Sequence, residues 1–210
     1  MALGCDTATN VTSARLTTLQ DNDFTFVGRY LNRVEGAHDG LTAAEVKRIS
    51  EGGLYIVSIY QNNGSTGPDY FTNSQGVSDA EDAVTLADDL GQTDNTPIYF
   101  AVDFDATTSQ IRDNIVPYFQ GVLSVLNSSS KNPNGYKLGV YGSRAVCGYI
   151  RGSYSATTRY TFIVDNNWQG DFDDWNLRQY KFNQTLGSGT GQIKVDYVES
   201  SSHGGGGWKK

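Results

Sequence analysis

The chain has 210 residues, of which 38% are hydrophobic and 12% aromatic, and its net charge is −7. This length and composition are enough to bury one sizeable core, so we expect one main domain and a monomer. The 16 Lys and Arg residues, against 23 Asp and Glu residues, form no basic stripe. This argues against a nucleic-acid partner and against binding to anionic membranes. No apolar run approaches the roughly 18 residues that a membrane-spanning helix needs.

Cysteine and histidine, the usual residues of zinc sites and nucleophilic triads, are scarce. Cys5 and Cys147 lie far apart without metal-ligand spacing, so we expect two buried thiols. His38 lies in a loop-like stretch and His203 in the C-terminal segment, which argues against a zinc site and a Ser-His-Asp triad. The chemistry of the chain is therefore expected to use carboxylates, tyrosines or a metal bound by oxygen ligands, and no cofactor is expected.

Short β-rich runs alternate along the chain with longer amphipathic runs. The predicted strands are 2–6, 24–31, 54–61, 97–104, 136–143, 160–167, 175–182 and 193–200. The predicted helices are 11–21, 42–51, 77–90, 108–127 and 143–151. Asn10 is a candidate N-cap, while Thr42 with Glu45 and Ser78 with Glu81 have the spacing of capping boxes. The connections QGDFDD and NQTLGSGTGQ, after the sixth and seventh strands, are interpreted as loops.

Eight strands joined mostly by helices predict an α/β fold, a compact (β/α)8 TIM-type barrel in which some helices are short or missing. The alternative is an open doubly wound sheet, but GCDTATN follows the first strand where that fold has a glycine-rich phosphate loop. Residues 1–200 are thus expected to form the barrel. The low-complexity residues 201–210 are expected to be a flexible tail or linker.

Acidic residues stand at the ends of predicted strands, where barrel enzymes form their active sites. Asp6 closes the first strand, Asp103 and Asp105 close the fourth, and Asp196 lies in the eighth, which neighbours the first once the barrel closes. Alternation along the fourth strand turns Asp103 and Asp105 to the same face, toward the barrel mouth. Carboxylates this close should have split pKa values, as acid–base chemistry at glycosidic bonds requires. A purely structural role for Asp105, as a helix cap, is the alternative.

Aromatic and amide side chains near the same strand ends indicate a carbohydrate cleft, since tyrosine and tryptophan offer apolar faces with a polar edge. Individually such residues are more often packing residues, and it is the ring around the acids that favours a glycan. The candidates for substrate binding are Tyr60, Gln61, Tyr99, Tyr141, Asp165, Trp168, Gln179 and Tyr180.

Several stretches resemble a known family. GCDTAT, LTAAEVKRISEGGLYIVSIYQ, PIYFAVDFDAT, GVYGSR and RQY…VDYV look like the glycoside-hydrolase-like domain of unknown function of bacterial cell-wall and phage-associated proteins. That family is similar to the family 25 lysozymes. The resemblance covers about residues 3–200 and implies a flattened β/α barrel in which Asp6, Asp103, Asp105 and Asp196 match the acidic residues of the lysozymes. The lysozymes have a glutamate, as general acid, where this chain has Asp105. Glu35 and Glu199 are the other candidates for that role.

The resemblance and the strand-end acids favour a glycoside hydrolase acting on peptidoglycan or a related N-acetylated glycan, with Asp105 protonating the leaving oxygen. The alternative is a non-catalytic glycan- or cell-wall-binding barrel that has lost the general acid. A third hypothesis is a hydrolase with Mg²⁺ or Ca²⁺ on the four aspartates. The expected partner is cell-wall polysaccharide and the expected location is extracellular or cell-wall associated, although MALGCD is too short and uncharged for a signal peptide.

Overall fold

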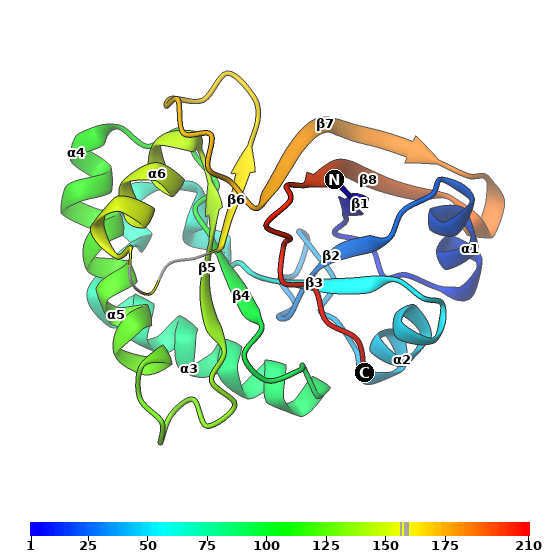
Figure 1. Cartoon of the computed structure of the whole chain (residues 1–210), viewed down its shortest axis with the longest axis horizontal. Helices are drawn as coiled ribbons and strands as arrows, with labels where there is room; N and C mark the ends of the chain where they lie inside the picture. The colour runs from blue at the N-terminus through cyan, green and yellow to red at the C-terminus, as the bar shows by residue number, and fades with distance from the viewer. Residues whose placement is uncertain (156, 158–159) are drawn as a thin grey trace.

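The structure, a computed structural model, describes residues 1–155, 157 and 160–210. Within these residues the strands close into a barrel in chain order, which confirms the predicted fold (Figure 1). The strands are β1 (Leu3–Asp6), β2 (Phe26–Tyr30), β3 (Tyr55–Tyr60), β4 (Pro97–Ala101), β5 (Lys137–Gly142), β6 (Tyr160–Val164), β7 (Leu177–Leu186) and β8 (Ile193–Ser200). Neighbouring strands from β1 to β7 are parallel, whereas β8 is antiparallel to both β7 and β1.

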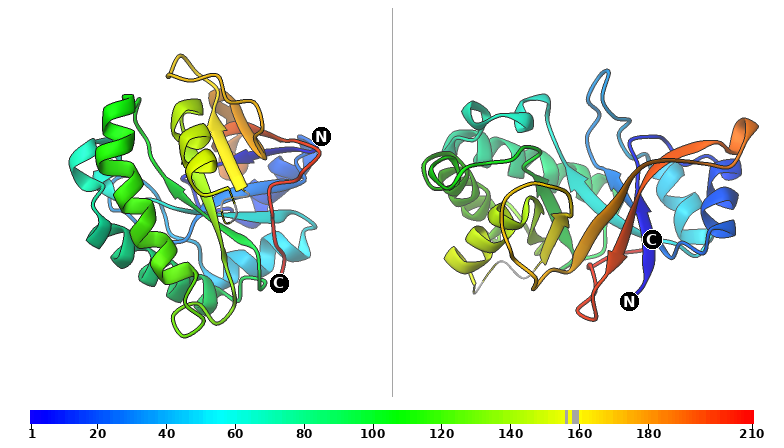
Figure 2. Two further views of the ribbon diagram at one scale, coloured as in Figure 1. Left: turned by 60° about the vertical axis from the view of Figure 1, so that its left-hand side comes forward. Right: turned by 90° about the horizontal axis from the view of Figure 1, so that it is seen from above.

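Helices follow the first five strands and lie outside the barrel, as Figure 2 shows from two further sides. The α-helices are α1 (Ser13–Asp21), α2 (Ala43–Glu51), α3 (Asn73–Leu90), α4 (Thr108–Gln110), α5 (Val116–Leu126) and α6 (Arg144–Ser153). The shorter turns are η1 (Asn63–Thr66), η2 (Pro68–Tyr70), the π-helical η3 (Ile111–Ile115) and η4 (Gly189–Gly191). None of the described helices combines the length and the apolar character needed to cross a membrane.

The predicted helix 108–127 is divided into three parts. At its π-turn the Val116 N–H donates to the Ile111 carbonyl oxygen, five residues back. Pro117 comes next, near the start of α5, where a proline without an N–H donor is tolerated. The segment is therefore divided at Pro117, which lies in the first turn of a new helix, α5.

The predicted helix caps are only partly correct. Thr42 caps α2 by accepting from the Glu45 N–H, but the Glu45 carboxylate turns into the core instead of completing a capping box. Thr12 caps α1, so the prediction of Asn10 was wrong. Thr72 caps α3, and the predicted box of Ser78 and Glu81 lies inside that helix.

Side chains alternate along β4 between two apolar layers. Ile98, Phe100 and Val102 belong to the outer layer that packs with the helices, while Tyr99 and Ala101 belong to the cluster inside the barrel. This part of the predicted alternation is confirmed. The regular strand ends at Ala101, however, so the alternation cannot be extended to the acids beyond it.

The last two strands form a long hairpin with only the short turn η4 and no α-helix between them. Leaving the barrel, the hairpin reaches over α1, where Thr18 Oγ1 donates to the Gly191 carbonyl oxygen at 2.8 Å and Arg15 Nε donates to that of Gln192 at 3.1 Å (Figure 1). The predicted lack of helices after β6 and β7 is confirmed. The segment 183–192 is not wholly a loop, because β7 continues to Leu186.

Residues 201–210 are packed on the barrel, so the prediction of a flexible tail was wrong. The Trp208 side chain is 2% exposed, and its indole N–H donates to Ser58 Oγ at 2.9 Å. The Trp208 backbone forms a β-bridge with Ile56, near the N-terminal end of β3. A single aromatic residue therefore anchors a segment rich in serine and glycine. The composition of the segment alone does not predict this anchoring.

Replacing this anchor should destabilise the barrel. We expect Trp208→Ala to lower the free energy of unfolding by about 3–5 kcal/mol, as for other buried tryptophans, because it leaves a cavity and removes the donor to Ser58. Urea unfolding monitored by circular dichroism measures the change. Lys210→Ala, at an exposed position two residues away, is the matched control and should change stability by less than about 0.5 kcal/mol. Equal effects of the two variants would contradict the anchoring role.

Candidate active site

Two carboxylates face each other where the barrel closes. Asp6, the last residue of β1, is the direct partner of Asp196 in the antiparallel ladder of β1 and β8. Gln179 on β7 is buried beside them, and its Nε2 donates to Asp6 Oδ2 at 2.8 Å and to Asp196 Oδ2 at 3.0 Å. Its Oε1 accepts from the Tyr141 hydroxyl at 3.1 Å. One amide thus joins two of the predicted catalytic residues and one predicted substrate-binding residue.

The environment makes both carboxylates harder to ionise. Burial raises the pKa of Asp6 well above its ordinary value, and the nearby Asp196 raises it further, against the opposing effect of the Gln179 hydrogen bond. Burial also raises the pKa of Asp196, opposed by the Asn183 N–H, which donates to Oδ1 at 2.5 Å, and by the charge of Lys194. The pair therefore retains a proton at pH values where a free aspartate has lost it.

Asp103 is the third carboxylate of this cluster. It lies just beyond β4, and its charge raises the pKa of both Asp6 and Asp196. Burial raises the pKa of Asp103 itself, opposed by Gln61 Nε2, which donates to its Oδ2 at 3.1 Å. Its backbone N–H donates to the Ser65 carbonyl oxygen at 2.9 Å. The loop between β3 and α3 therefore holds Asp103 through both its side chain and its backbone.

Asp105 does not join the other three acids. Because β4 ends at Ala101 and the chain bends at Phe104, Asp105 is exposed, and its Oδ1 accepts from the Gln169 N–H at 2.8 Å. The expectation that Asp103 and Asp105 share one face of a strand was therefore wrong. The capping alternative was wrong too, since Thr107 is the N-cap of the following helix.

Four of the predicted substrate-binding residues lie at the mouth. Gln61, Tyr141 and Gln179 hydrogen-bond within the acidic cluster, and Trp168, in the loop between β6 and β7, packs against the apolar cluster inside the barrel. Together they form a polar and aromatic border around Asp6, Asp103 and Asp196.

The other four point elsewhere. Tyr60 faces the helical layer and its hydroxyl donates to Asp82 Oδ2 at 2.8 Å. Tyr99 is inside the barrel, but its hydroxyl donates to the Gly205 carbonyl oxygen of the C-terminal segment at 3.0 Å. Asp165 forms ion pairs with Arg144 and Arg178, and Tyr180 packs against Tyr197 and Arg178. Strand parity accounts for Tyr60, since Val57 and Ile59 of the same strand face the barrel interior.

Neither candidate glutamate replaces a general acid at the cluster. Glu35 is exposed on the loop after β2, where it lines an adjoining pocket of about 270 Å³ whose lining includes none of Asp6, Asp103 and Asp196. Glu199 lies opposite Leu3 in the ladder and pairs with Arg178 at 2.8 Å. Because β8 is antiparallel, its C-terminal end points away from the mouth.

Sequence reasoning missed two residues of the mouth, Tyr30 and His38. Tyr30 ends β2, and its ring stacks on that of His38, with centroids 3.9 Å apart and an interplanar angle of 13°. Tyr30 lines a pocket of about 180 Å³ together with Asp6, Thr7, Ala8, Thr9, Asn183, Lys194, Val195 and Asp196. The signal that identified Tyr141, an aromatic residue near the end of a barrel strand, also applies to Tyr30.

Two buried polar networks hold the loops that carry the cluster. Arg29 Nε pairs with Glu45 Oε1 at 2.8 Å, and both side chains are 0% exposed. Arg29 also donates to the Thr7 carbonyl oxygen at 2.7 Å, and Glu45 accepts from the Val11 N–H at 2.8 Å. The ion pair therefore fixes the segment that directly follows Asp6.

The second network is centred on Asp79 of α3. This buried carboxylate accepts from the hydroxyls of Tyr70 and Tyr118 at 2.6 and 2.7 Å, from Gln75 at 2.8 Å and from Asn62 at 3.1 Å. Asn62 directly follows Gln61, so the network holds the part of the loop from which Gln61 reaches Asp103.

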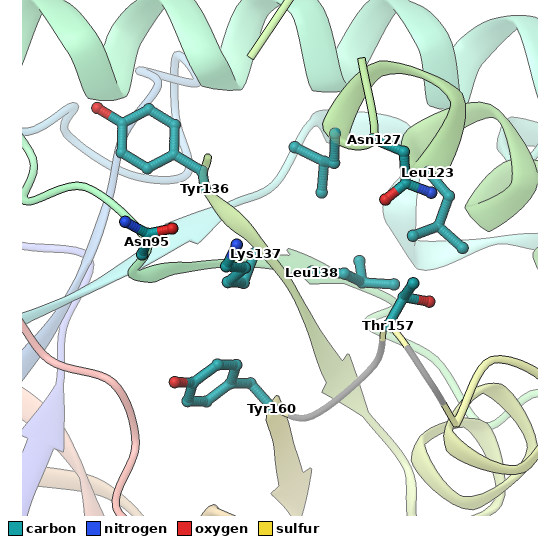
Figure 3. A pocket seen from close by; sticks show the side chains of 9 residues that line it. Asn95, Leu123, Asn127, Tyr136, Lys137, Leu138, Thr157 and Tyr160 are labelled. Atoms are coloured by element: carbon teal, nitrogen blue, oxygen red, sulfur yellow. The ribbon is translucent and has the colours of Figure 1, made fainter. Parts of the chain in front are cut away.

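A pocket elsewhere on the molecule lacks this chemistry. Figure 3 shows this pocket between α5 and the beginnings of β5 and β6, with Tyr136, Lys137 and Tyr160 in its lining. Its volume is about 390 Å³. Its described lining contains no carboxylate. Within the described residues no group of three or more histidine, cysteine, aspartate or glutamate side chains is arranged to hold a metal ion.

The fold is a TIM-type barrel, and Asp6, Asp103 and Asp196 gather at its mouth, where barrel enzymes form their active sites. The family model described as "Rv2525c-like, glycoside hydrolase-like domain" matches residues 17–200. The chain belongs to this family, in agreement with the resemblance found in the sequence.

Two curated relatives are proteins of Bacillus subtilis (strain 168). The uncharacterized protein YbfG is 37% identical in an alignment of 210 residues that covers 93% of this chain and 28% of YbfG. The uncharacterized protein FadG is 32% identical in an alignment of 200 residues that covers 92% of this chain and 34% of FadG. The chain thus spans about a third of the length of the curated relatives it matches.

Solved structures agree on the fold. The Tat-secreted protein Rv2525c of Mycobacterium tuberculosis, in complex with L-tartrate, has a TM-score of 0.79 at 22% identity over 99% of this chain and 98% of its own. A family 25 glycosyl hydrolase from Bacillus anthracis has a TM-score of 0.54 at 13% identity, covering 96% of this chain and 89% of its own. The modular autolysin LytC of Streptococcus pneumoniae, in complex with a synthetic peptidoglycan ligand, has a TM-score of 0.60 at 13% identity, covering 94% and 46%.

Removing the charge of Asp6 should stabilise the fold at neutral pH. Because the folded state raises the pKa of this carboxyl, the folded chain binds more protons than the unfolded chain between the ordinary and the raised pKa, and stability falls as pH rises through that window. Asp6→Asn removes this loss. We expect a higher free energy of unfolding than the wild type at pH 7, and a difference that shrinks toward zero near pH 3, measured by urea unfolding.

Asp113→Asn is the matched control. This exposed carboxyl has its pKa lowered by the hydrogen bond from Arg112, so its charge does not weaken the fold, and its removal should give no gain at pH 7. A gain of equal size in both variants would mean that lower net charge alone is responsible. A loss of stability in Asp6→Asn at pH 7 would contradict the raised pKa.

Proposed function

We propose that the chain is a glycoside hydrolase that acts on peptidoglycan or a related N-acetylated glycan of the cell wall. The observation that carries the proposal is the convergence of Asp6, Asp103 and Asp196, all with raised pKa values, at the mouth of the barrel. Carboxyl groups that keep their proton above the ordinary titration range of aspartate are suited to act as general acids in the cleavage of glycosidic bonds. The likeness in fold to LytC, whose structure contains a peptidoglycan ligand, supports the cell-wall substrate.

Asp103 is the carboxyl best suited to donate the proton. It is half-buried at the mouth with a raised pKa, whereas Asp105 is exposed and its Oδ1 accepts a hydrogen bond from the Gln169 N–H. In the reaction Asp103 protonates the leaving oxygen as the glycosidic C–O bond breaks. A water molecule then adds to the anomeric carbon and gives a proton back to the Asp103 carboxylate. Asp6 and Asp196 would orient the sugar and stabilise the positive charge that develops at the anomeric carbon.

The border of the mouth suits a sugar chain. Trp168, in the loop after β6, offers an aromatic surface over the apolar cluster inside the barrel. Asn183 and Lys194 line the pocket that contains Asp6 and Asp196 with polar groups. Aromatic faces and polar edges in one cleft match the alternating apolar and hydroxyl-bearing surfaces of a glycan. We propose an extracellular or cell-wall location for the chain, as befits such a substrate. The Tat-secreted Rv2525c supports this location.

A non-catalytic glycan-binding barrel is the second candidate. It is favoured by the position of Asp105, which is a methylene shorter than the glutamate of the family 25 lysozymes and is turned to solvent. In this alternative the mouth binds the glycan without cleaving it, because no carboxyl delivers a proton to the leaving oxygen.

Paired variants separate the two candidates and test the proton donor. We expect Asp103→Asn to reduce the release of reducing ends from purified peptidoglycan by about 10²- to 10⁴-fold, the usual contribution of a general acid. Asp105→Asn should keep activity within about tenfold of the wild type, since its carboxylate faces solvent. Activity of the wild type should fall as pH rises through the pKa of Asp103, because the proton to be donated is lost.

Digestion of peptidoglycan and of chitin oligomers, followed by mass spectrometry, is the measurement. The opposite ranking, with Asp105→Asn inactive and Asp103→Asn active, would assign the proton to Asp105. Binding of the glycan by the wild type without any product after long incubation would support the non-catalytic alternative.

A further inference from the structure

Tyr30 lies beside the proposed catalytic aspartates, where a residue that contacts the substrate is expected. The acid–base chemistry of the aspartates does not itself assign a role to it. It ends β2, borders the pocket of about 180 Å³ with Asp6 and Asp196, and is partly buried. All three carboxylates of the cluster influence the hydroxyl of Tyr30, as they influence that of Tyr141. Two tyrosine hydroxyls therefore lie within the electrostatic reach of the same acids.

Only one of these two hydroxyls has its proton engaged. The Tyr141 hydroxyl donates to Gln179 Oε1 at 3.1 Å. The Tyr30 hydroxyl has no hydrogen-bond partner among the described residues. It is also not one of their fully buried polar atoms that lack a partner, so it remains accessible. Burial, followed by the charges of Asp6, Asp103 and Asp196, raises the pKa of Tyr30, so its phenol keeps its proton throughout the ordinary pH range. The mouth thus contains a phenolic donor that is free to bind a ligand.

The ring that carries this donor is held in place. His38 stacks on it, and His38 Nε2 lies 3.2 Å from the Gln61 carbonyl oxygen. A carbonyl oxygen only accepts, so Nε2 carries the proton of the imidazole. Burial lowers the pKa of His38, which keeps the ring neutral. Gln61 also donates to Asp103, so the stack is tied to the same residue that positions the third carboxyl.

The balance of donors and acceptors indicates the chemical group that would fit. The carboxylates of the cluster are acceptors when ionised and can bind N–H and O–H groups of a sugar. Tyr30 requires an acceptor, and a carbonyl oxygen is an acceptor only. An N-acyl group presents one N–H and one carbonyl oxygen side by side, which matches a carboxylate next to a free phenol. At the same position a deacetylated sugar carries an ammonium group, which has donors alone and leaves the hydroxyl of Tyr30 unused.

We propose that the Tyr30 hydroxyl donates a hydrogen bond to the carbonyl oxygen of an N-acyl group on the bound sugar and thereby selects N-acylated over N-deacetylated glycans. The proposal rests on the glycan-binding function proposed above. His38 acts as a positioning residue that holds the phenol through the stacked rings.

Binding of two oligomers tests the selection. Chitin tetramers and their fully deacetylated counterparts are titrated calorimetrically into the wild type and Tyr30→Phe, over times at which mass spectrometry detects no product. We expect Tyr30→Phe to bind the acetylated tetramer about 2- to 10-fold more weakly, the weight of one neutral hydrogen bond, and the deacetylated tetramer unchanged. Phenylalanine keeps the ring and its stack, so an unchanged thermal midpoint is expected as well.

Tyr55→Phe is the matched control, because Tyr55 is exposed at the other end of the barrel, at the start of β3, and should affect neither tetramer. For His38, a double-mutant cycle with His38→Ala and Tyr30→Phe is measured on the acetylated tetramer. The effect of His38→Ala should be smaller in the Tyr30→Phe background, which a merely structural role would not produce.

The outcomes are distinguishable. Equal weakening toward both tetramers, or none toward the acetylated one, overturns the selection by Tyr30 and leaves the proposed function standing. If the wild type binds neither tetramer nor peptidoglycan, the proposed function fails and the inference fails with it.

Discussion

The antiparallel pairing of β8 with β1 is the constraint on which the acidic mouth depends. A parallel β8 would carry Asp196 away from Asp6, whereas the reversed strand places the two side by side in one ladder. Two carboxylates in a buried setting repel each other and lose hydration. The structure offsets this cost through the single amide of Gln179 and through retained protons, so the feature that strains the fold also supplies its chemistry.

The reversal of β8 also explains why the β7–β8 hairpin extends beyond the barrel. A helix is not needed to reverse the chain between β7 and β8, so the two strands extend as a hairpin over α1. The loops after β1 and β3 carry other polar groups of the mouth and require internal support. Arg29 with Glu45 fixes the loop after β1, and Asp79 with its tyrosine and amide donors fixes the loop after β3. Such rigid support keeps the dipoles of a site oriented before a ligand arrives.

Periodicity was sufficient to predict the strands, the barrel and the meeting of Asp6 with Asp196, because those features follow from alternation and chain order. It failed at Asp105, where the chain bends three residues after the strand ends, and no local pattern marks that bend. Strand direction was equally hidden, which is why Glu199 remained a candidate. Tyr30 and His38 become neighbours only through tertiary packing, and Trp208 closes on the barrel from a segment whose composition suggests disorder.

The chemistry of the mouth depends on one cluster, formed by Asp6, Asp103 and Asp196, in which each carboxyl has a pKa above the ordinary value of an aspartate. A pH titration of the carboxyl carbons by nuclear magnetic resonance, with each aspartate assigned by its asparagine variant, measures this directly. The account predicts that all three titrate above the ordinary aspartate value of about 3.9, with the pKa of Asp6 strongly displaced and shifting when Asp196 is replaced. Three independent titrations at or below the ordinary value would contradict it.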